Sequence, residues 1–266
     1  EQQGHRYVLR DHALLESADF YLWNDRMFVQ IDHRGRSTAM FNQPQHSFYS
    51  EELRAFYLRD DSTGELFSVP FDPVCKKPDS FEFSVGIGDI RWEISYGNLQ
   101  IKVEFVVPRN DTVELWRVSV KNTGKEHRKL TLVNYHPIGF MSWLNNEAHF
   151  VESLNAIVCD FFPYYAKVAD YYRLREKKNV VACAADRVPT AWECSKEIFC
   201  GLSGLHAPQS LVEAKNLGKG DAQHEDTLAA MQFPLEIASG QSDSISFVFG
   251  PAHDHKEVKD LSDRYL

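Results

Sequence analysis

The stretch from Tyr57 to Arg117 constrains the fold most, because polar and apolar residues alternate in it over several consecutive runs. In the run from 90 to 96, Ile90, Trp92 and Ile94 fall on one face and polar or charged residues on the other. Turn-forming sequences separate the runs: DDSTG (60–64), GIGD (86–89) and YGN (96–98). A period of two with turn signals about every ten residues predicts a long antiparallel meander with one buried face.

The chain has 266 residues, which is enough to bury one large core, so we expect one all-β domain to account for most of it. Its net charge is −9, with acidic and basic side chains mixed along the chain, which argues against nucleic acid or an anionic membrane as a partner. No apolar run approaches the roughly 20 residues of a membrane span, and the first residues show no signal-peptide pattern. We therefore expect a cytoplasmic location and neither membrane nor nucleic-acid partners.

The cysteines are odd in number and have no metal-binding spacing: Cys75, Cys159, Cys183, Cys194 and Cys200. No pair has the C-x-x-C arrangement of redox or zinc motifs. We therefore expect buried free thiols in a reducing compartment, and neither a metal nor a cofactor.

The last residues change period. Val258, Leu261 and Tyr265 are spaced as one stripe of a helix. We expect residues 1–253 to form the β domain and residues 254–266 to begin a helix that leads out of it. Within the β domain, we expect 43–56 to be a loop, 163–184 to be strands with a turn at 176–179, and 191–211 to be a strand or short helical turn followed by a Gly-rich loop.

Five sequences carry a resemblance to a known family. They are QHSFYS (45–50), FYLRDDSTGELFSVPFDPV (56–74), VELWRVSVKNT (113–123), FCGLSGLHAPQSL (199–211) and DTLAAMQFPLEIASGQSDSISFVFGPA (226–252). In this order, and across nearly the whole chain, they resemble the amino-terminal domain of glycoside hydrolase family 94. That family includes cellobiose and chitobiose phosphorylases, 1,2-β-oligoglucan phosphorylases and part of the cyclic β-1,2-glucan synthases.

The resemblance implies a large two-sheet antiparallel β-sandwich, a supersandwich similar to galactose mutarotase, with a short C-terminal helix. In full-length relatives, a helical linker and an (α/α) barrel follow this domain. The family's mechanism inverts the anomeric centre: an aspartic acid of the barrel protonates the glycosidic oxygen while inorganic phosphate attacks the anomeric carbon. The resemblance therefore implies a non-catalytic domain that lines the sugar site and supports a homodimer, with β-glucosides or oligoglucans, phosphate and the barrel as partners.

The QHSFYS loop is the first candidate for sugar contact. Phe48 and Tyr49 offer flat faces, and Gln45, His46 and Ser47 offer hydrogen-bonding groups beside them. Sugars favour a flat apolar face flanked by polar groups. The alternative is that the aromatic side chains of this loop pack into the sandwich.

Two further sets combine an aromatic ring with amides. Trp143 stands close to Asn145 and Asn146, although a core tryptophan in a hairpin would give the same pattern. Residues 23–26, Trp-Asn-Asp-Arg, form a weaker set, because the family pattern has a glycine there that this chain lacks.

Two other functions remain open from the sequence. A stand-alone carbohydrate-binding module would use the high aromatic content, 13% of residues. A mutarotase-like epimerase would need a histidine and a glutamate to converge on a sugar, for which His136 and His149 are the candidates. His253 and His255 are two residues apart, so they do not share a helix face, and we expect a solvated turn rather than a metal site there.

Overall fold

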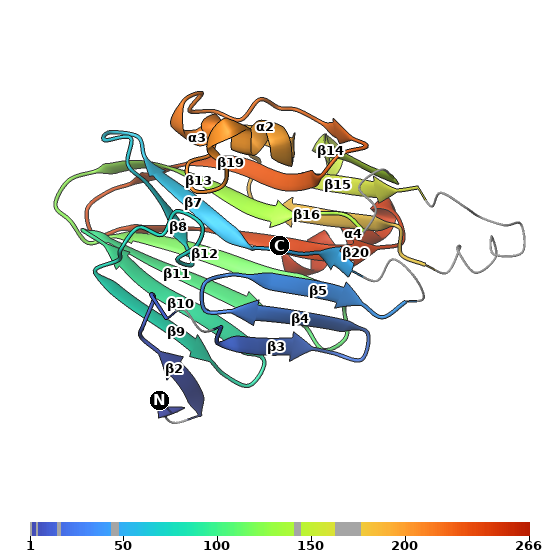
Figure 1. Cartoon of the computed structure of the whole chain (residues 1–266), viewed down its shortest axis with the longest axis horizontal. Helices are drawn as coiled ribbons and strands as arrows, with labels where there is room; N and C mark the ends of the chain where they lie inside the picture. Colours follow the sequence, from blue (N-terminus) through green and yellow to red (C-terminus); the bar gives the residue numbers. More distant parts are fainter. Residues whose placement is uncertain (1, 4, 15–16, 44–47, 141–144, 163–176) are drawn as a thin grey trace, which may run out of the picture.

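The computed structural model describes the chain except for residues 1, 4, 15–16, 44–47, 141–144 and 163–176 (Figure 1). The described strands form sheets of eleven, five and four strands, and every pairing between these strands is antiparallel. This confirms the all-β antiparallel prediction. No helix in the described part of the chain is both long and apolar enough to cross a bilayer.

The eleven-stranded sheet forms one complete layer. Its strands, in spatial order, are β1 (Gln2–Gln3), β2 (Arg6–Leu9), β9 (Ser80–Val85), β10 (Asp89–Tyr96), β11 (Leu99–Val106), β12 (Glu114–Asn122), β20 (Ser242–Ala252), β16 (Val180–Ala185), β15 (Ala156–Phe161), β14 (Asn146–Val151) and β18 (Ala222–Gln223). The meander from β9 to β12 follows the predicted alternation. In β10 the three apolar residues Ile90, Trp92 and Ile94 are buried, while the residues between them are partly or fully exposed.

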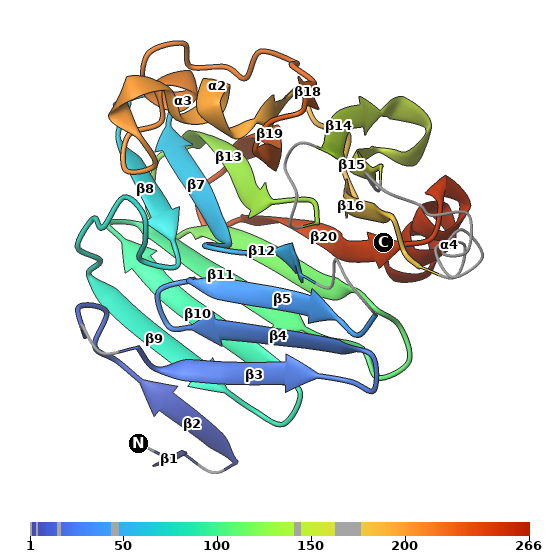
Figure 2. The ribbon, with the colours of Figure 1, turned by 45° about the vertical axis from the view of Figure 1, so that its right-hand side comes forward.

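Two smaller sheets share the opposite layer, so the second half of the sandwich is divided rather than continuous (Figure 2). The five-stranded sheet has the order β17 (Ala191–Ser195), β19 (Thr227–Ile237), β13 (Arg128–Pro137), β7 (Ala55–Asp60) and β8 (Leu66–Val69). The four-stranded sheet has the order β3 (Asp19–Trp23), β4 (Met27–Asp32), β5 (Ser37–Phe41) and β6 (Phe48–Ser50). The division falls between β6 and β7, which do not pair although only residues 51–54 separate them. The segment 43–56, expected to be a loop, thus contains β6 and the first residues of β7.

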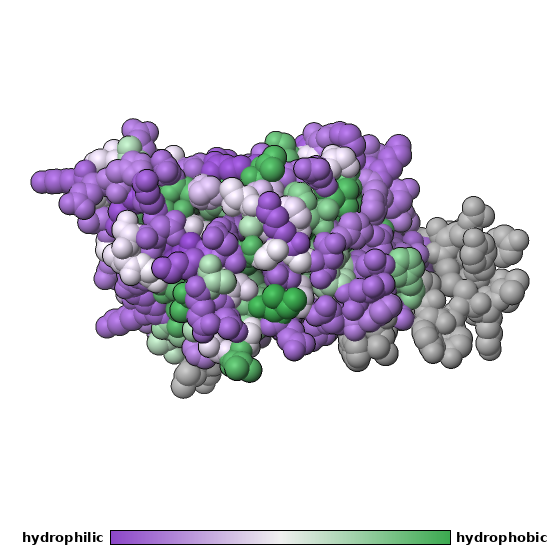
Figure 3. Space-filling model, turned by 90° about the horizontal axis from the view of Figure 1, so that it is seen from above, coloured by the Kyte–Doolittle hydropathy of each residue, from purple (hydrophilic) through white to green (hydrophobic). Residues whose placement is uncertain are grey.

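Short helices cover the outside of both layers. They are η2 (Glu152–Leu154), α2 (Lys196–Cys200), η3 (Gly201–Ser203), α3 (Gln209–Val212) and α4 (His255–Tyr265). Helices α2 and α3 lie above the five-stranded sheet in Figure 1, and their residues Phe199 and Leu211 pack with Tyr57 and Tyr135 in a second apolar cluster. Viewed from above, this capped side is mostly hydrophilic, with separate small hydrophobic areas (Figure 3).

Helix α4 confirms the helix that the change of period in residues 254–266 predicted. The side chain of Asp254 caps its first turn by accepting a hydrogen bond from the Glu257 amide at 2.8 Å. Its buried residues Val258 and Leu261 pack on β16 and β20, on the side of the eleven-stranded sheet that faces away from the main core.

Burial on both faces explains why several strands lack alternation. All six residues of β7 are buried, because one face meets the main core and the other lies under α2 and α3. Such strands read as continuous apolar runs, which periodicity alone cannot distinguish from other buried elements. The expectation for 191–211 is confirmed, since β17 leads directly into α2 and η3. Most of the 163–184 segment lies outside the described residues; its end forms β16.

The five cysteines are free thiols, as expected, but not all of them are buried. Cys159, Cys183 and Cys194 are buried, Cys200 is partly exposed and Cys75 is exposed. Burial raises the pKa of the Cys159 thiol to about 12, which keeps it in the unreactive neutral form.

A fully buried ion pair joins the two layers. Glu114 on β12 accepts hydrogen bonds from two nitrogens of Arg54, at 3.0 and 2.7 Å, and both side chains are 0% exposed. The same carboxylate accepts the hydroxyl of Tyr49 at 2.8 Å and the indole N–H of Trp116 at 2.9 Å. Arg54 also donates to Ser37 Oγ at 2.7 Å. With these partners, neither charge is left without compensation in the core.

We expect Glu114→Gln to lower the free energy of unfolding by about 3–5 kcal/mol, because it leaves the Arg54 charge buried without a counter-charge. The matched control is Glu236→Gln, whose partner Lys129 is 3.8 Å away and mostly exposed, and which should cost less than about 1 kcal/mol. Urea unfolding measures both variants. Equal small losses would show that the buried pair is not needed to hold the layers together.

Candidate functional site

The outward face of the four-stranded sheet carries an apolar row that crosses all four strands. Strand pairing places Trp23 opposite Phe28, Phe28 opposite Met40, and Met40 opposite Phe48, so the four side chains share one face. We call these four residues the aromatic row. The residues that alternate with them along the strands face the core, among them Leu22, Val29 and Ile31. Trp23 is 68% exposed and Phe28 is 36% exposed.

A hollow of about 330 Å³ lies at the Trp23 end of the aromatic row. Its walls combine the row with polar groups, including Asp25, Arg26 and Asn42. The ring of Tyr21 lies beside Phe28, with centroids 5.3 Å apart, and extends the apolar surface along β3. An exposed flat ring next to carboxylate, guanidinium and amide groups is the combination that favours a sugar.

Within the Trp23–Arg26 set, Asn24 has a structural role. Its Nδ2 donates to the carbonyls of Pro108 and Asp111 at 2.8 and 2.9 Å. Its Oδ1 accepts the amides of Arg26 and Met27 at 3.0 and 2.9 Å, which shapes the turn between β3 and β4. Its amide group is therefore fully engaged within the protein, and Trp23, Asp25 and Arg26 are the members of the set that face solvent.

The QHSFYS residues divide between the two faces of the sheet. Phe48 is half-buried and belongs to the aromatic row. Tyr49 points inward, is 0% exposed and donates its hydroxyl to Glu114. Burial and the nearby Glu114 charge raise the pKa of Tyr49 well above its usual value. Tyr49 therefore packs into the sandwich, which is the alternative given for this loop, and its ring offers no face to a ligand. Gln45 and His46 lie outside the described residues.

The two predicted asparagines also differ in their surroundings. Asn146 is buried, and its Nδ2 donates to the Phe140 carbonyl at 3.2 Å. This burial leaves it no surface for a sugar. Asn145 is partly exposed, and its carbonyl accepts the Phe162 amide at 2.9 Å. Trp143, the ring of this set, lies outside the described residues.

Among the described residues, strand pairing and one backbone hydrogen bond connect the neighbourhoods of the predicted sets. Trp23 and Phe48 are at the two ends of the aromatic row. Next to Phe48, the carbonyl of Tyr49 accepts the Gly139 amide at 3.2 Å, which joins the QHSFYS strand to the segment that leads to Asn145 and Asn146. Tyr49 and Gly139 are 90 positions apart in sequence, so the fold brings two distant segments side by side here.

Lys178 holds the chain just after β5, beside the hollow, and it was not predicted from the sequence. It is 2% exposed, and its Nζ donates to Glu257 at 2.6 Å and to Thr112 at 2.7 Å. Its backbone amide and carbonyl bond to the side chain of Gln43, two residues after β5. Burial lowers the pKa of Lys178, while the Glu257 carboxylate opposes this change.

Phe28 and Met40 were also not predicted as site residues from the sequence. A signal was present in the strand from 27 to 32, where Phe28 is apolar although its neighbours Met27 and Val29 already supply the buried face. An apolar residue on the second face of an alternating strand indicates a surface that something covers.

The mutarotase hypothesis is wrong for His136. Its ring is 0% exposed and lies among Phe56, Trp116 and Phe249, with centroids 5.1–5.7 Å away. Its Nδ1 lies 3.1 Å from Asn134 Nδ2 in the core. A ligand in solvent cannot reach this ring, and His149 lies elsewhere, on β14.

The eleven-stranded sheet and the two smaller sheets opposite it define the chain as a large antiparallel β-sandwich domain. A family model, glycosyl hydrolase 94 supersandwich domain, matches residues 19–266. The chain therefore belongs to glycoside hydrolase family 94, and the described sheets are its supersandwich domain.

Two relatives illustrate the similarity. Cellobionic acid phosphorylase of Neurospora crassa is 35% identical over 99% of this chain and 36% of its own length. The 3-O-beta-D-glucopyranosyl-beta-D-glucuronide phosphorylase of Paenibacillus borealis is 23% identical over 97% of this chain and 33% of its own length. The chain thus spans about a third of the length of these relatives.

Among solved structures, a bacterial glucoamylase complexed with acarbose matches 97% of this chain and 37% of its own, with a TM-score of 0.51 and 8% identity. At this identity the likeness shows the fold alone.

Burial lowers the pKa of His136 well below its usual value, and the Arg54 charge contributes in the same direction. Below about pH 6.5 the unfolded chain binds a proton at this residue and the folded chain does not, so stability falls as the pH falls. We expect His136 alone to make the free energy of unfolding about 1.4 kcal/mol lower at pH 5.5 than at pH 7.5.

Urea unfolding of the wild type and of His136→Gln at both pH values measures this contribution. The variant should lose about 1.4 kcal/mol less than the wild type between the two pH values. The exposed His206→Gln is the control and should keep the wild-type difference. Parallel pH dependence in His136→Gln and the wild type would contradict a neutral buried His136.

Proposed function

We propose that this chain is the non-catalytic sandwich domain of a β-glucoside phosphorylase, and that the aromatic row lines the sugar site. The observation that carries the proposal is the exposed Trp23 ring beside Asp25, Arg26 and Asn42, in a domain whose family is shown. The full-length protein would act in the cytoplasm as a homodimer, with this domain contributing to assembly.

The proposed reaction belongs to the whole protein. In the family mechanism an aspartic acid of the barrel protonates the glycosidic oxygen, and phosphate attacks the anomeric carbon from the opposite face. Attack on a β-glucoside with inversion gives α-glucose 1-phosphate. The supersandwich domain covers about a third of each relative, which leaves room in them for the barrel.

The proposed substrate is a β-glucosyl unit linked to a sugar acid. Both relatives described above are named for substrates that contain a sugar acid. Arg26 is the exposed cation of the hollow, and its guanidinium lies 4.9 Å from the Phe41 ring centroid, which restricts its position. A guanidinium held in this way can pair with a carboxylate of the substrate while Trp23 stacks on a sugar ring.

A stand-alone carbohydrate-binding module is the second candidate, because the same exposed Trp23 would serve it. Calorimetric titration of this chain with cellobiose and cellobionic acid separates the two. Millimolar or tighter binding without any further domain would favour a module, and its absence favours a domain that completes a site formed with other parts of the enzyme.

The activity itself is tested with the full-length gene product and with this chain alone, each given phosphate and either cellobionic acid or cellobiose. We expect α-glucose 1-phosphate from the full-length protein only. Release of sugar phosphate by the isolated chain would overturn the non-catalytic assignment, and no release by the full-length protein from any β-glucosyl disaccharide would overturn the phosphorylase assignment.

We expect Trp23→Ala in the full-length protein to lower kcat/KM roughly tenfold, because loss of a stacked ring costs about 1–1.5 kcal/mol. The change should fall mainly on KM, since the ring binds substrate without joining the chemical step. The control is Tyr7→Ala, an aromatic side chain that is 49% exposed on β2 outside the aromatic row. A similar loss of kcat/KM in both variants would contradict the proposal that the aromatic row lines the sugar site.

A further inference from the structure

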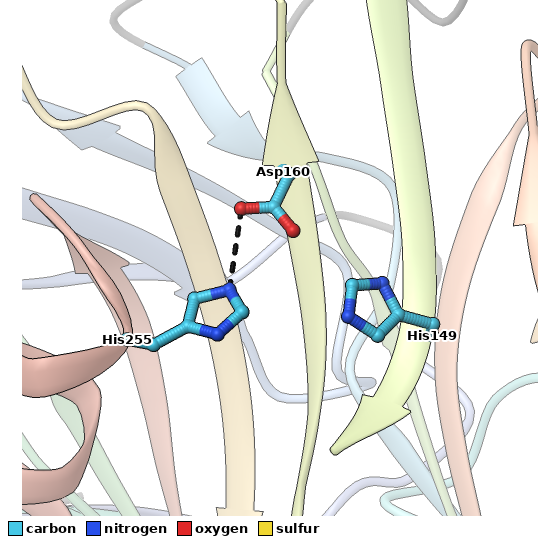
Figure 4. Close-up of side chains that lie close together, drawn as sticks. All are labelled: His149, Asp160 and His255. Atoms are coloured by element: carbon cyan, nitrogen blue, oxygen red, sulfur yellow. Dashed lines mark hydrogen bonds and ion pairs between the residues drawn. The ribbon is translucent and has the colours of Figure 1, made fainter.

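Two histidines and an aspartate that are distant in sequence converge near the beginning of α4. Figure 4 shows His149 on β14, Asp160 on β15 and His255 on α4 pointing toward one another. One ligand atom from each lies within 4.8 Å of the others. The aromatic row and the buried Glu114 pair include none of these residues.

The sheet register brings the first two residues together. His149 pairs with Val158, and Asp160, two residues further along β15, therefore points to the same face. Diagonal neighbours of this kind lie about 7–8 Å apart at their Cα atoms, so their longer side chains can meet. Val158 packs with Val258 of α4, which identifies this face as the one that α4 covers.

Helix α4 holds His255 in place through contacts that are independent of the cluster. Val258 is buried against the sheet, and Glu257 accepts the Lys178 ammonium at 2.6 Å. At the other end of the helix, Tyr265 donates its hydroxyl to Asp111 at 2.7 Å. His255, the first residue of α4, is thus fixed above β14 and β15 before any ligand binds.

The distances suit a metal ion. His255 Nε2 and Asp160 Oδ1 are 3.3 Å apart. Two ligands of one tetrahedral zinc ion, at bond lengths of 2.0–2.1 Å, are separated by about the same distance. The rings of His149 and His255 have centroids 6.2 Å apart, so a modest rotation of the His149 side chain closes the third contact. The side chains of His255 and Asp160 are 43% and 26% exposed, which leaves the ligands open to solvent.

The donor set selects the kind of ion. Two imidazoles and one carboxylate suit Zn²⁺, Co²⁺ or Ni²⁺, whereas Ca²⁺ and Mg²⁺ prefer oxygen ligands alone. Glu147 pairs directly with Asp160 in the β14–β15 register and points to the same face, so it or a water molecule can supply a fourth ligand.

We propose that His149, Asp160 and His255 bind one divalent transition-metal ion, with Zn²⁺ as the best fit, and that the ion fastens the start of α4 to β14 and β15. The local pair His253 and His255 does not form this site. His253 Nδ1 instead lies 3.3 Å from the Lys177 carbonyl, while His255 faces the strands.

The test uses the chain after removal of metals with a chelator. Titration calorimetry with Zn²⁺ should show one ion bound per chain, and Co²⁺ should give the visible absorption of tetrahedral coordination. Zn²⁺ at about 100 times its Kd should raise Tm by about 5–10 °C, because it binds only the folded chain. Absence of binding, or binding of several ions without a rise in Tm, would overturn the proposal and leave Asp160 and His255 as a simple ion pair.

Variants locate the site. His149→Ala, Asp160→Asn and His255→Ala should each weaken Zn²⁺ binding more than about 100-fold, since loss of a direct ligand should exceed the 10–100-fold cost of losing a supporting contact. All three positions are at least partly exposed, and circular dichroism confirms that the variants fold. His253→Ala and Cys75→Ser, which change the nearby histidine and the exposed thiol, should bind as tightly as the wild type. Loss of binding in either control, or unchanged binding in the three ligand variants, would overturn the assignment.

Discussion

Glu114 is the residue whose buried carboxylate ties the two layers of the sandwich together. Its carboxylate belongs to β12 of the eleven-stranded sheet, while Tyr49 and Arg54, which donate to it, come from the border between the two smaller sheets. Desolvated charges are costly unless they are paired and hydrogen-bonded, so the layers must dock in a way that keeps Glu114 and Arg54 in contact. It also fixes β6, because Tyr49 can reach Glu114 only if its neighbour Phe48 faces outward.

The sequence predicted the fold where one face of a strand is solvated. In β10 the alternation of Ile90, Trp92 and Ile94 with polar residues corresponds to the observed burial. It predicted less where both faces are covered, as in β7, because burial under α2 and α3 removes the period. The division of the second layer could not be foreseen at all, since it depends on the missing pairing between β6 and β7 rather than on any local pattern.

The candidate site shows the same limit. Aromatic residues beside amides and charges made Trp23 and Phe48 candidates, and both lie on the outward face, but composition alone could not tell that Tyr49 and Asn146 face inward. Orientation within a strand depends on register, and register is set by the whole sheet. The convergence of His149, Asp160 and His255 is the extreme case, because the last two are 95 residues apart and no motif spacing connects them.

Lys178 has a consequence for how the last helix is connected to the hollow. Its ammonium holds Glu257 on α4, and its backbone holds Gln43, just beyond the strand that carries Met40. One residue therefore couples the last helix to the edge of the aromatic row. Because Met40 and Asn42 line the hollow beside Trp23, the contacts of Lys178 link α4 to Gln43, the residue that directly follows the wall of the hollow in the chain.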